Sequence, residues 1–229
     1  MTPVNTPSQA RKVFLIGATG GVGKRVIARL TAAGHTVTGL HRSNDDAGTV
    51  RDAGAQPVQG DIAADSVDNF AERIAGHDAV IFCAGAGGGD QVDAIDGAGP
   101  GKAARAATKA AVNRFVLVSV FMDAWRGDES PGDGFERYVA AKRHADVDLA
   151  ATDLDWLIVR PGTLTDDDGT GKITAGIAVA YNTITRDDVA AFLTAAVFTP
   201  ALNRIAVEIT GGDTSLEQAV SGLEPRPAS

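Results

Sequence analysis

Short unbroken runs of apolar residues alternate along this chain with longer segments in which apolar residues recur every three or four positions. The first run is residues 13–16, and residues 24–30, which follow it after a turn, have the longer spacing. An unbroken apolar run is typical of a strand buried on both faces of a parallel sheet, and the longer spacing is typical of an amphipathic helix. The ordered part of the chain is therefore expected to begin with a strand, a turn and a helix.

The same alternation continues to the end of the chain. Further strands are expected at residues 36–40, 56–59, 79–82, 115–120, 154–160 and 205–209, and helices at 66–75, 102–111, 135–146 and from 185 onward. Residues 90–101 stay unassigned because glycine and proline interrupt any helix there. Strands that alternate with helices form a parallel sheet with helices on both faces. The pattern predicts a single α/β domain with a Rossmann-like, doubly wound parallel sheet of about seven strands.

The turn after the first strand carries glycine at positions 17, 20 and 23. Gly17 lets the chain turn sharply, Gly20 lets a phosphate approach the backbone, and Gly23 lets the helix pack close to the strand. The free N–H groups and the dipole of the new helix then favour an anion. An ordinary strand-to-helix turn is the alternative, but the flanking strand and helix favour a dinucleotide pyrophosphate site. The contacts predicted there are Gly17, Thr19, Gly20, Gly21, Val22 and Gly23.

The end of the second expected strand carries His41, Arg42 and Ser43, and no acidic residue. A cofactor with a free ribose 2′-hydroxyl usually meets an Asp or Glu about 20 residues after the glycines. An acidic side chain would repel a 2′-phosphate, whereas the planar guanidinium of Arg42 can bind one. These residues favour NADP(H) as the cofactor, with NAD(H) as the alternative if Asp45 or Asp46 turns toward the ribose.

Two more strand ends carry residues suited to the same ligand. Gly60, Asp61 and Ile62 follow the third strand, where Asp61 could accept a hydrogen bond from the adenine amino group and Ile62 could pack on the ring. Helix capping is the alternative role of Asp61, and the sequence does not decide between the two. Ala84 and Gly85 follow the fourth strand, where small residues let a ligand approach. All these positions lie at the carboxyl ends of strands, where ligands bind in such sheets.

Tyr138 and Lys142 are four residues apart on an expected helix and therefore share one face. A lysine ammonium beside a phenol lowers the pKa of the phenol, and such a tyrosine can act as general acid or base toward a carbonyl or hydroxyl. Lys142 could also hold the nicotinamide ribose. A surface tyrosine near a solvated lysine is the alternative. The pair predicts hydride-transfer chemistry with Tyr138 as the acid or base.

Four features together resemble the short-chain dehydrogenase/reductase superfamily: the glycine turn at 17–23, the strand that ends in Ser119, the Tyr138-Lys142 spacing, and the segment 160–162. The similarity is greatest to its atypical, extended-like branch of NAD(P)-binding, NAD-dependent epimerase/dehydratase-like proteins, and it covers roughly residues 12–210. The resemblance implies a Rossmann fold, NADP binding, and a serine that orients the substrate carbonyl beside the Tyr-Lys pair. That serine is Ser119 if the family position falls at the strand end, and Val120 replaces it if the position falls one residue later.

The resemblance also implies that the segment after the sixth strand lies over the nicotinamide. Backbone groups after a proline meet the carboxamide in the family, and here the proline fixes φ while a glycine allows a close turn. The residues predicted to contact the cofactor there are Arg160, Pro161, Gly162 and Thr163.

Charge and composition exclude several other classes. The net charge of -8 disfavours nucleic acid and anionic membrane as partners, because phosphates would be repelled. The single cysteine, Cys83, cannot form an intrachain disulfide and is expected to be a buried core residue. The four histidines have no metal-ligand spacing, and the acidic run 166–168 lacks the spacing of a calcium loop and is expected to be a solvated turn. The first residues are polar and no run reaches about 18 apolar residues, so a cytoplasmic protein is expected.

The expected organisation is a disordered lead-in at residues 1–10, an NAD(P)-binding domain at 11–215 and a tail at 216–229. A small substrate-side region is expected within the domain, at roughly 161–215. We expect an NADP(H)-dependent oxidoreductase of a small carbonyl or hydroxyl compound, acting as a monomer or homodimer. A non-catalytic NADP-binding sensor and an NAD(P)-dependent epimerase/dehydratase are the alternatives. The substrate contacts are expected in residues 85–101, 120–134 and 163–182, but these residues do not identify the substrate.

Overall fold

The computed structural model describes residues 9–124 and 132–224. The strands are β1 (Lys12–Ile16), β2 (Thr36–His41), β3 (Gln56–Gln59), β4 (Ala79–Phe82), β5 (Arg114–Val118), β6 (Asp155–Pro161), β7 (Thr163–Thr165), β8 (Lys172–Gly176), β9 (Thr183–Thr185), β10 (Ile205–Gly211) and β11 (Thr214–Ser215). The helices are α1 (Gly21–Ala32), α2 (Asp46–Asp52), α3 (Val67–Ile74), the short π-helix η1 (Asp93–Gly97), α4 (Ala98–Lys109), α5 (Asp133–Ala150), α6 (Arg186–Ala196) and α7 (Leu216–Gly222).

Within the described residues, the body of the sheet is parallel and has the strand order β3-β2-β1-β4-β5-β6-β10. The prediction of a Rossmann-like sheet is confirmed. The order reverses between β1 and β4, the position where dinucleotides bind in doubly wound sheets. The sheet as a whole has nine strands, because β8 and β11 extend it beyond β10 in antiparallel pairing. β7 and β9 form a separate parallel pair.

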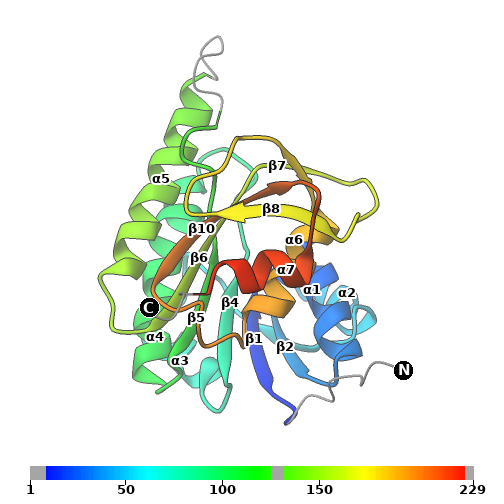
Figure 1. Cartoon of the computed structure of the whole chain (residues 1–229). Helices are drawn as coiled ribbons and strands as arrows, with labels where there is room; N and C mark the ends of the chain where they lie inside the picture. Colours follow the sequence, from blue (N-terminus) through cyan, green and yellow to red (C-terminus); the bar gives the residue numbers. More distant parts are fainter. Residues whose placement is uncertain (1–8, 125–131, 225–229) are drawn as a thin grey trace.

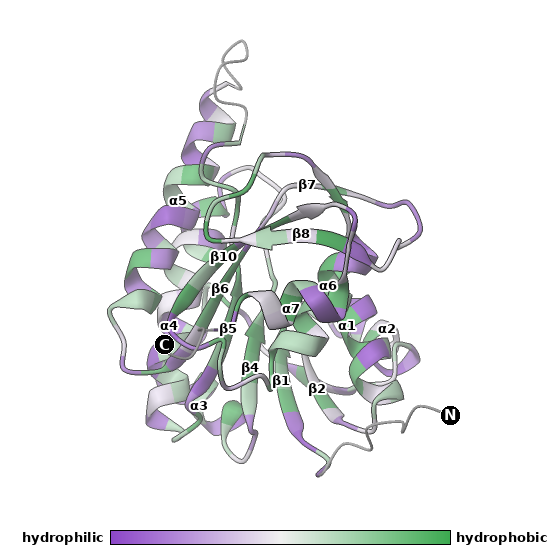
Figure 2. Cartoon of the chain, in the orientation of Figure 1, coloured by the Kyte–Doolittle hydropathy of each residue, from purple (hydrophilic) through white to green (hydrophobic). Residues whose placement is uncertain are grey.

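Helices cover both faces of the sheet, so that two apolar cores form (Figure 1). One core contains Phe14 and Phe115 and packs beneath α3, α4 and α5. The other contains Leu15 and Phe192 and packs beneath α1, α6 and α7. Neighbouring residues of a strand point to opposite faces, so Phe14 and Leu15 of β1 join different cores. Figure 2 shows the central strands in apolar colours and hydrophilic residues along α5, as expected for a sheet buried on both faces.

Two segments differ from the expected organisation. The predicted tail is wrong in its first half, because residues 216–222 form α7 and bury Ala219 and Val220. The unassigned stretch 90–101 contains η1 and the start of α4. Pro100 lies in the first turn of α4, directly after η1. The predicted lead-in lies outside the described residues except for its last two.

The end of β5 also differs, and it bears on the site. The strand ends at Val118 rather than at residue 120, and the N–H of Ser119 donates to Val159 O at 2.7 Å. Ser119 and Val120 therefore begin the loop that leaves the carboxyl edge of the sheet. Among the helices of the described segments, none combines the length and the apolar character that crossing a membrane requires.

Candidate active site and cofactor cleft

The glycine turn joins β1 to α1 where the strand order reverses. Gly17 has a φ of 99°, a left-handed conformation that favours glycine, and a Cβ there would lie 2.6 Å from the backbone N of Ala84. A Cβ on Gly23 would overlap Gly17 O, so α1 packs directly against the turn. Gly20 precedes α1 and donates its N–H to Gly17 O at 3.1 Å. The turn therefore leaves the first N–H groups of α1 open to an anion.

Two cavities lie along the carboxyl edge of the sheet and share walls at Gly20, Ala84 and Gly85. The larger has a volume of about 770 Å³ and extends from the glycine turn to Tyr138. The smaller has a volume of about 370 Å³ and extends from the same turn to the ends of β2 and β3. A dinucleotide that crosses the switch point has its two halves on either side of the glycine turn. The pair of cavities fits such a ligand.

Most of the predicted site residues line this cleft. The smaller cavity is lined by the predicted residues Gly17, Thr19, Gly20, His41, Arg42, Gly60, Asp61, Ile62, Ala84 and Gly85. The larger cavity is lined by the predicted residues Gly20, Gly21, Val22, Ala84, Gly85, Ser119, Tyr138, Lys142, Pro161, Gly162 and Thr163. In the part of the chain that the structure describes, Gly23, Ser43 and Arg160 are the predicted residues that line neither cavity.

Charges of both signs lie at the outer end of the smaller cavity, where Arg42 and Asp46 both line the wall. His41 is buried, and its Nδ1 lies 2.9 Å from Ser43 O, which fixes the bend after β2. The Ser43 hydroxyl accepts a hydrogen bond from the N–H of Asp45 at 3.3 Å and serves the same bend. The guanidinium expected to meet a 2′-phosphate is thus present, and so is the carboxylate expected to meet a free ribose.

Asp61 has a local structural role at the end of β3. Its Oδ1 accepts hydrogen bonds from the N–H groups of Ala63 at 2.8 Å and Ala64 at 3.1 Å. This closes the turn before α3, and the helix itself is capped by Ser66, whose hydroxyl accepts from Asn69 N at 3.1 Å. The capping alternative therefore describes what the Asp61 carboxylate does, but the cap is on a turn rather than on the helix.

The Tyr138-Lys142 pair lies on α5 at the far end of the larger cavity. Lys142 is 3% exposed, and its Nζ lies 5.8 Å from the centre of the Tyr138 ring. Its ammonium forms an ion pair with Asp96 Oδ1 at 3.1 Å and donates to Val118 O at 3.3 Å. Asp96 belongs to η1 and is fully buried. The charge of Lys142 is therefore balanced by a carboxylate that the sequence analysis did not identify.

The prediction that Lys142 lowers the pKa of Tyr138 is wrong for this geometry. Burial raises the pKa of Tyr138 to about 12, and the negative charge of Asp96 acts in the same direction. The phenol is protonated at neutral pH in this state. The protonated phenol can donate a proton, and only the phenolate that remains can accept one.

A second buried carboxylate lies behind Ser119. Asp146 of α5 forms an ion pair with Arg160 Nη2 of β6 at 3.0 Å. Burial raises the pKa of Asp146, and the Ser119 hydroxyl, Arg160 and Lys142 each partly offset that rise. The Arg160 guanidinium is directed to α5 rather than into the cleft, because the buried carboxylate needs a partner. This differs from the cofactor contact expected of it.

The sequence carries a signal for one of the two missed carboxylates, Asp146. Tyr138, Lys142 and Asp146 follow one another at four-residue steps and so form one stripe of α5, which makes Asp146 a candidate for burial beside the pair. Asp96 directly follows apolar Ile95, but the glycines around it hid the helix that positions it.

Aromatic side chains form the rest of the wall near Tyr138. Phe121, Phe135, Leu164 and Tyr181 line the larger cavity there. The rings of Phe121 and Tyr181 meet edge to face with centroids 5.3 Å apart. The Tyr181 hydroxyl forms a hydrogen bond with the hydroxyl of Thr163. Among the described residues, the side chains that line this end of the cavity are mainly apolar, and residues 125–131 of the predicted substrate-contact segment 120–134 lie outside the described residues.

Cys83 follows β4 and contributes to both cavities. Burial raises the pKa of its thiol to about 12, and its Sγ faces Ile16 O at 3.4 Å. A thiol with this pKa is a poor nucleophile at neutral pH, in agreement with a packing role. Across residues 9–124 and 132–224, no group of three or more His, Cys, Asp or Glu side chains could hold a metal ion.

The switch-point cleft, the glycine turn and the Tyr-Lys pair on α5 define a class, the NAD(P)-binding proteins of the short-chain dehydrogenase/reductase type. The model of the family described as NAD(P)H-binding matches residues 17–200. The chain belongs to this family.

Named relatives cover nearly the whole chain. The protein named "uncharacterized sugar epimerase YhfK" of Bacillus subtilis is 33% identical over 216 residues, which are 93% of this chain and 100% of the relative. The structure of an NAD-dependent epimerase/dehydratase-type protein of Bacillus halodurans is similar with a TM-score of 0.84 and 30% identity, over 93% of this chain and 100% of that one. The structure of ChuY, described as an anaerobilin reductase of Escherichia coli O157:H7, is similar with a TM-score of 0.70 and 25% identity, over 95% and 100% of the two chains.

Proposed function

We propose that the protein is an NADP(H)-dependent reductase of a carbonyl compound, with Tyr138 as the proton donor. The observation that carries this proposal is that Tyr138, whose pKa is raised to about 12, lines the same cavity as Gly20 and Gly21 of the glycine turn. A dinucleotide held at that turn and extended into this cavity has its nicotinamide near the phenol. Hydride transfer coupled to proton donation requires this proximity.

The bound cofactor would supply the hydride. Residues of this chain donate the proton, stabilise the phenolate and orient the carbonyl. Tyr138 donates its proton to the carbonyl oxygen as that oxygen gains negative charge. The phenolate that remains is stabilised by the nearby Lys142 ammonium, which Asp96 holds in place. Ser119 lines the cavity wall and orients the carbonyl. At neutral pH the phenol is protonated, which is the state that proton donation to the substrate requires.

NADP(H) is the cofactor that the site favours. Arg42 lines the smaller cavity, where it can pair with a 2′-phosphate through two parallel hydrogen bonds. Asp46 lines the same wall, and NAD(H) binding is the alternative if this carboxylate meets the ribose.

The described lining favours a substrate with an apolar body. A site for a sugar needs several polar side chains to replace the water around its hydroxyl groups. The wall near Tyr138 instead presents Phe121, Phe135, Leu164 and Tyr181. A reductase of apolar carbonyl compounds is therefore better supported than the sugar epimerase for which the Bacillus subtilis relative is named.

Turnover of aromatic aldehydes, ketones and quinones, followed by the loss of NADPH absorbance, tests the proposal. We expect Tyr138→Phe to reduce turnover by roughly 10²–10⁴-fold, as loss of a general acid does. The affinity for NADPH should change less than about twofold, because the phenol is not needed to bind the phosphates. Tyr181→Phe is the matched control, because it removes the other tyrosine hydroxyl of the same cavity, and it should reduce turnover by less than about tenfold.

The outcomes separate the alternatives. Full turnover by the Tyr138→Phe variant contradicts the proton-donor role. NADPH binding without turnover of any carbonyl compound favours the non-catalytic sensor instead.

A further inference from the structure

Arg186, the first residue of α6, lies against the glycine turn at the start of α1. A Cβ placed on Gly21 would lie 2.8 Å from Arg186 Cδ and 3.2 Å from its Nε. The missing side chain at Gly21 therefore provides the space that the stem of Arg186 occupies. Arg186 lines the larger cavity together with Gly20, Gly21 and Val22. A cation is thus placed beside the N–H groups that are expected to meet the cofactor phosphates.

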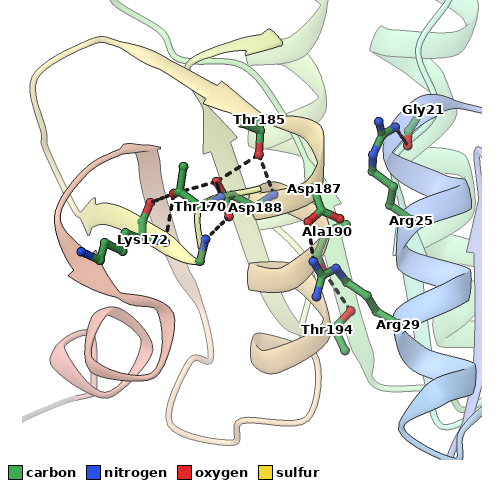
Figure 3. A network of polar contacts seen from close by, with 11 residues as sticks. Gly21, Arg25, Arg29, Thr170, Lys172, Thr185, Asp187, Asp188, Ala190 and Thr194 are labelled. Carbon is green, nitrogen blue, oxygen red and sulfur yellow. Dashed lines mark hydrogen bonds and ion pairs between the residues drawn. The ribbon is translucent and has the colours of Figure 1, made fainter. Parts of the chain in front are cut away.

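The two acidic residues that follow Arg186, Asp187 and Asp188, bind groups outside α6 (Figure 3). Asp187 accepts a hydrogen bond from Arg29 of α1 at 2.6 Å. Asp188 is buried, and it accepts from the N–H of Thr170 at 3.0 Å. The start of α6 is therefore tied to α1 on one side and to the loop 166–171 on the other. The side chain of Arg186 can change partners without moving its helix.

The Arg186 guanidinium now contacts a carboxylate of that loop, and its Nη1 also donates to Leu164 O at 3.5 Å. Asp166 Oδ2 lies 2.9 Å from Arg186 Nη1, and Asp166 Oδ1 lies 3.7 Å from Arg25 Nη2 of α1. Two guanidinium groups thus hold one anion beside the glycine turn. Asp166 is 74% exposed and Arg186 is 29% exposed, so the pair is well solvated and contributes little to stability. A pyrophosphate carries more charge and can accept two hydrogen bonds from one guanidinium.

We propose that Arg186 binds the pyrophosphate of the dinucleotide, and that Asp166 holds this arginine only in the cofactor-free protein. The proposal rests on the proposed function in one respect, since it needs a dinucleotide at the glycine turn. On binding, the Arg186 guanidinium leaves Asp166 and turns to the phosphate. Asp166 is then a competitor built into the chain, and it lowers the affinity for the cofactor.

Titrations of NADPH and of NADH into the full-length protein, followed by isothermal calorimetry, test both halves of the proposal. Arg186→Gln should raise the Kd of both dinucleotides by about tenfold and by the same factor, because both carry the pyrophosphate. Asp166→Asn should lower both Kd values by about two- to threefold, because it removes the competing anion. Arg42→Gln serves as a comparison, since a residue that binds the 2′-phosphate should affect the Kd of NADPH alone.

Two matched controls separate direct contact from general charge effects. Arg143→Gln changes an exposed arginine of α5, and Asp168→Asn changes a carboxylate of the same loop as Asp166. Each should change the Kd values by less than about twofold, because solvated charges away from the phosphate are screened by salt.

Several results would overturn the proposal. An unchanged Kd in Arg186→Gln would show that Arg186 does not contact the pyrophosphate. A higher Kd for NADPH alone would show that the arginine contacts the 2′-phosphate instead. Weaker binding by Asp166→Asn contradicts the competition, and this variant changes an exposed side chain and so tests the proposal even if Arg186→Gln does not fold. If the unaltered protein binds neither dinucleotide, the proposed function fails, and the inference fails with it.

Discussion

Two regions of the cleft, the glycine turn and the Tyr138 end of the larger cavity, are held in shape by different interactions. At the glycine turn, the shape depends on backbone atoms that approach closely, as Gly17 does toward Ala84 and Gly23 toward Gly17. At the Tyr138 end, it depends on buried charges from separate elements, with Asp96 of η1 paired to Lys142 of α5. In the first arrangement, all the required glycines lie in one continuous stretch of sequence, residues 17–23. The second exists only when distant elements pack together, so each charge depends on a partner elsewhere in the chain.

The larger effect is expected where a buried charge loses its partner. Asp96→Ala leaves Lys142 buried and unpaired, which should lower the free energy of unfolding by about 3–5 kcal/mol. Urea denaturation measures this change. The matched control is Asp93→Ala in the same π-helix, since Asp93 also pairs with a cation of α5, Arg137, but both side chains are exposed.

The control should lower the free energy of unfolding far less than Asp96→Ala does, because a solvated ion pair contributes little. Replacing Lys142 as well, in the double variant Asp96→Ala with Lys142→Met, should restore part of the lost stability because no unpaired charge remains. Equal losses from Asp96→Ala and Asp93→Ala would show that burial of the pair does not govern the Tyr138 end.

At the glycine turn, the expected loss comes from crowding of the backbone. Gly23→Ala puts a methyl group onto Gly17 O, and this should lower the free energy of unfolding by about 1–3 kcal/mol. Gly48→Ala is the matched control, because Gly48 is also in a helix and a Cβ there meets nothing within 4 Å. In the control, the free energy of unfolding should rise by about 0.5–1 kcal/mol, because alanine reduces the entropy of the unfolded chain. A Gly23→Ala variant as stable as the unaltered protein would show that α1 has room to move away from the turn.

The same contrast explains how much the sequence could predict. The parallel sheet and the residues around the glycine turn were predictable because apolar runs, helical spacing and glycine positions are local signals. The partners of Lys142 and Arg160 were not, since they depend on which face of α5 meets η1 and β6. The raised pKa of Tyr138 follows from those unpredicted partners: spacing placed Lys142 beside the phenol but gave no sign of Asp96. β8 and β11 were missed because neither has an unbroken apolar run, and both add to the sheet by antiparallel pairing at its edge.

A smaller effect, on the choice between NADPH and NADH, is expected in the smaller cavity, where Arg42 lies. Arg42→Gln should weaken NADPH binding by about tenfold and leave NADH binding within about twofold, because only NADPH carries the 2′-phosphate. Fluorescence titration of each dinucleotide measures the ratio. Asp46→Asn should change the ratio of the two affinities in the opposite direction, since removing this carboxylate should favour NADPH further. Equal weakening of both dinucleotides by Arg42→Gln would contradict the 2′-phosphate contact.

The smallest effect, and the most direct probe of the Tyr138 end, is the titration of the phenol itself. The near-ultraviolet absorbance of phenolate, as the difference between the unaltered protein and Tyr138→Phe, should show a pKa of about 12 for Tyr138. Because this pKa lies above the usual value near 10, the protonated phenol stabilises the fold below pH 10, and that contribution is lost as the pH rises toward 12. Asp96→Asn removes the charge that raises the pKa and should lower it, while burial keeps it above the usual value. Asp93→Asn, an exposed carboxylate on the same π-helix, should leave it unchanged. A Tyr138 that titrates below its usual value would instead mean that Lys142 acts on the phenol more strongly than Asp96 and burial together, and that Tyr138 is suited to accept a proton.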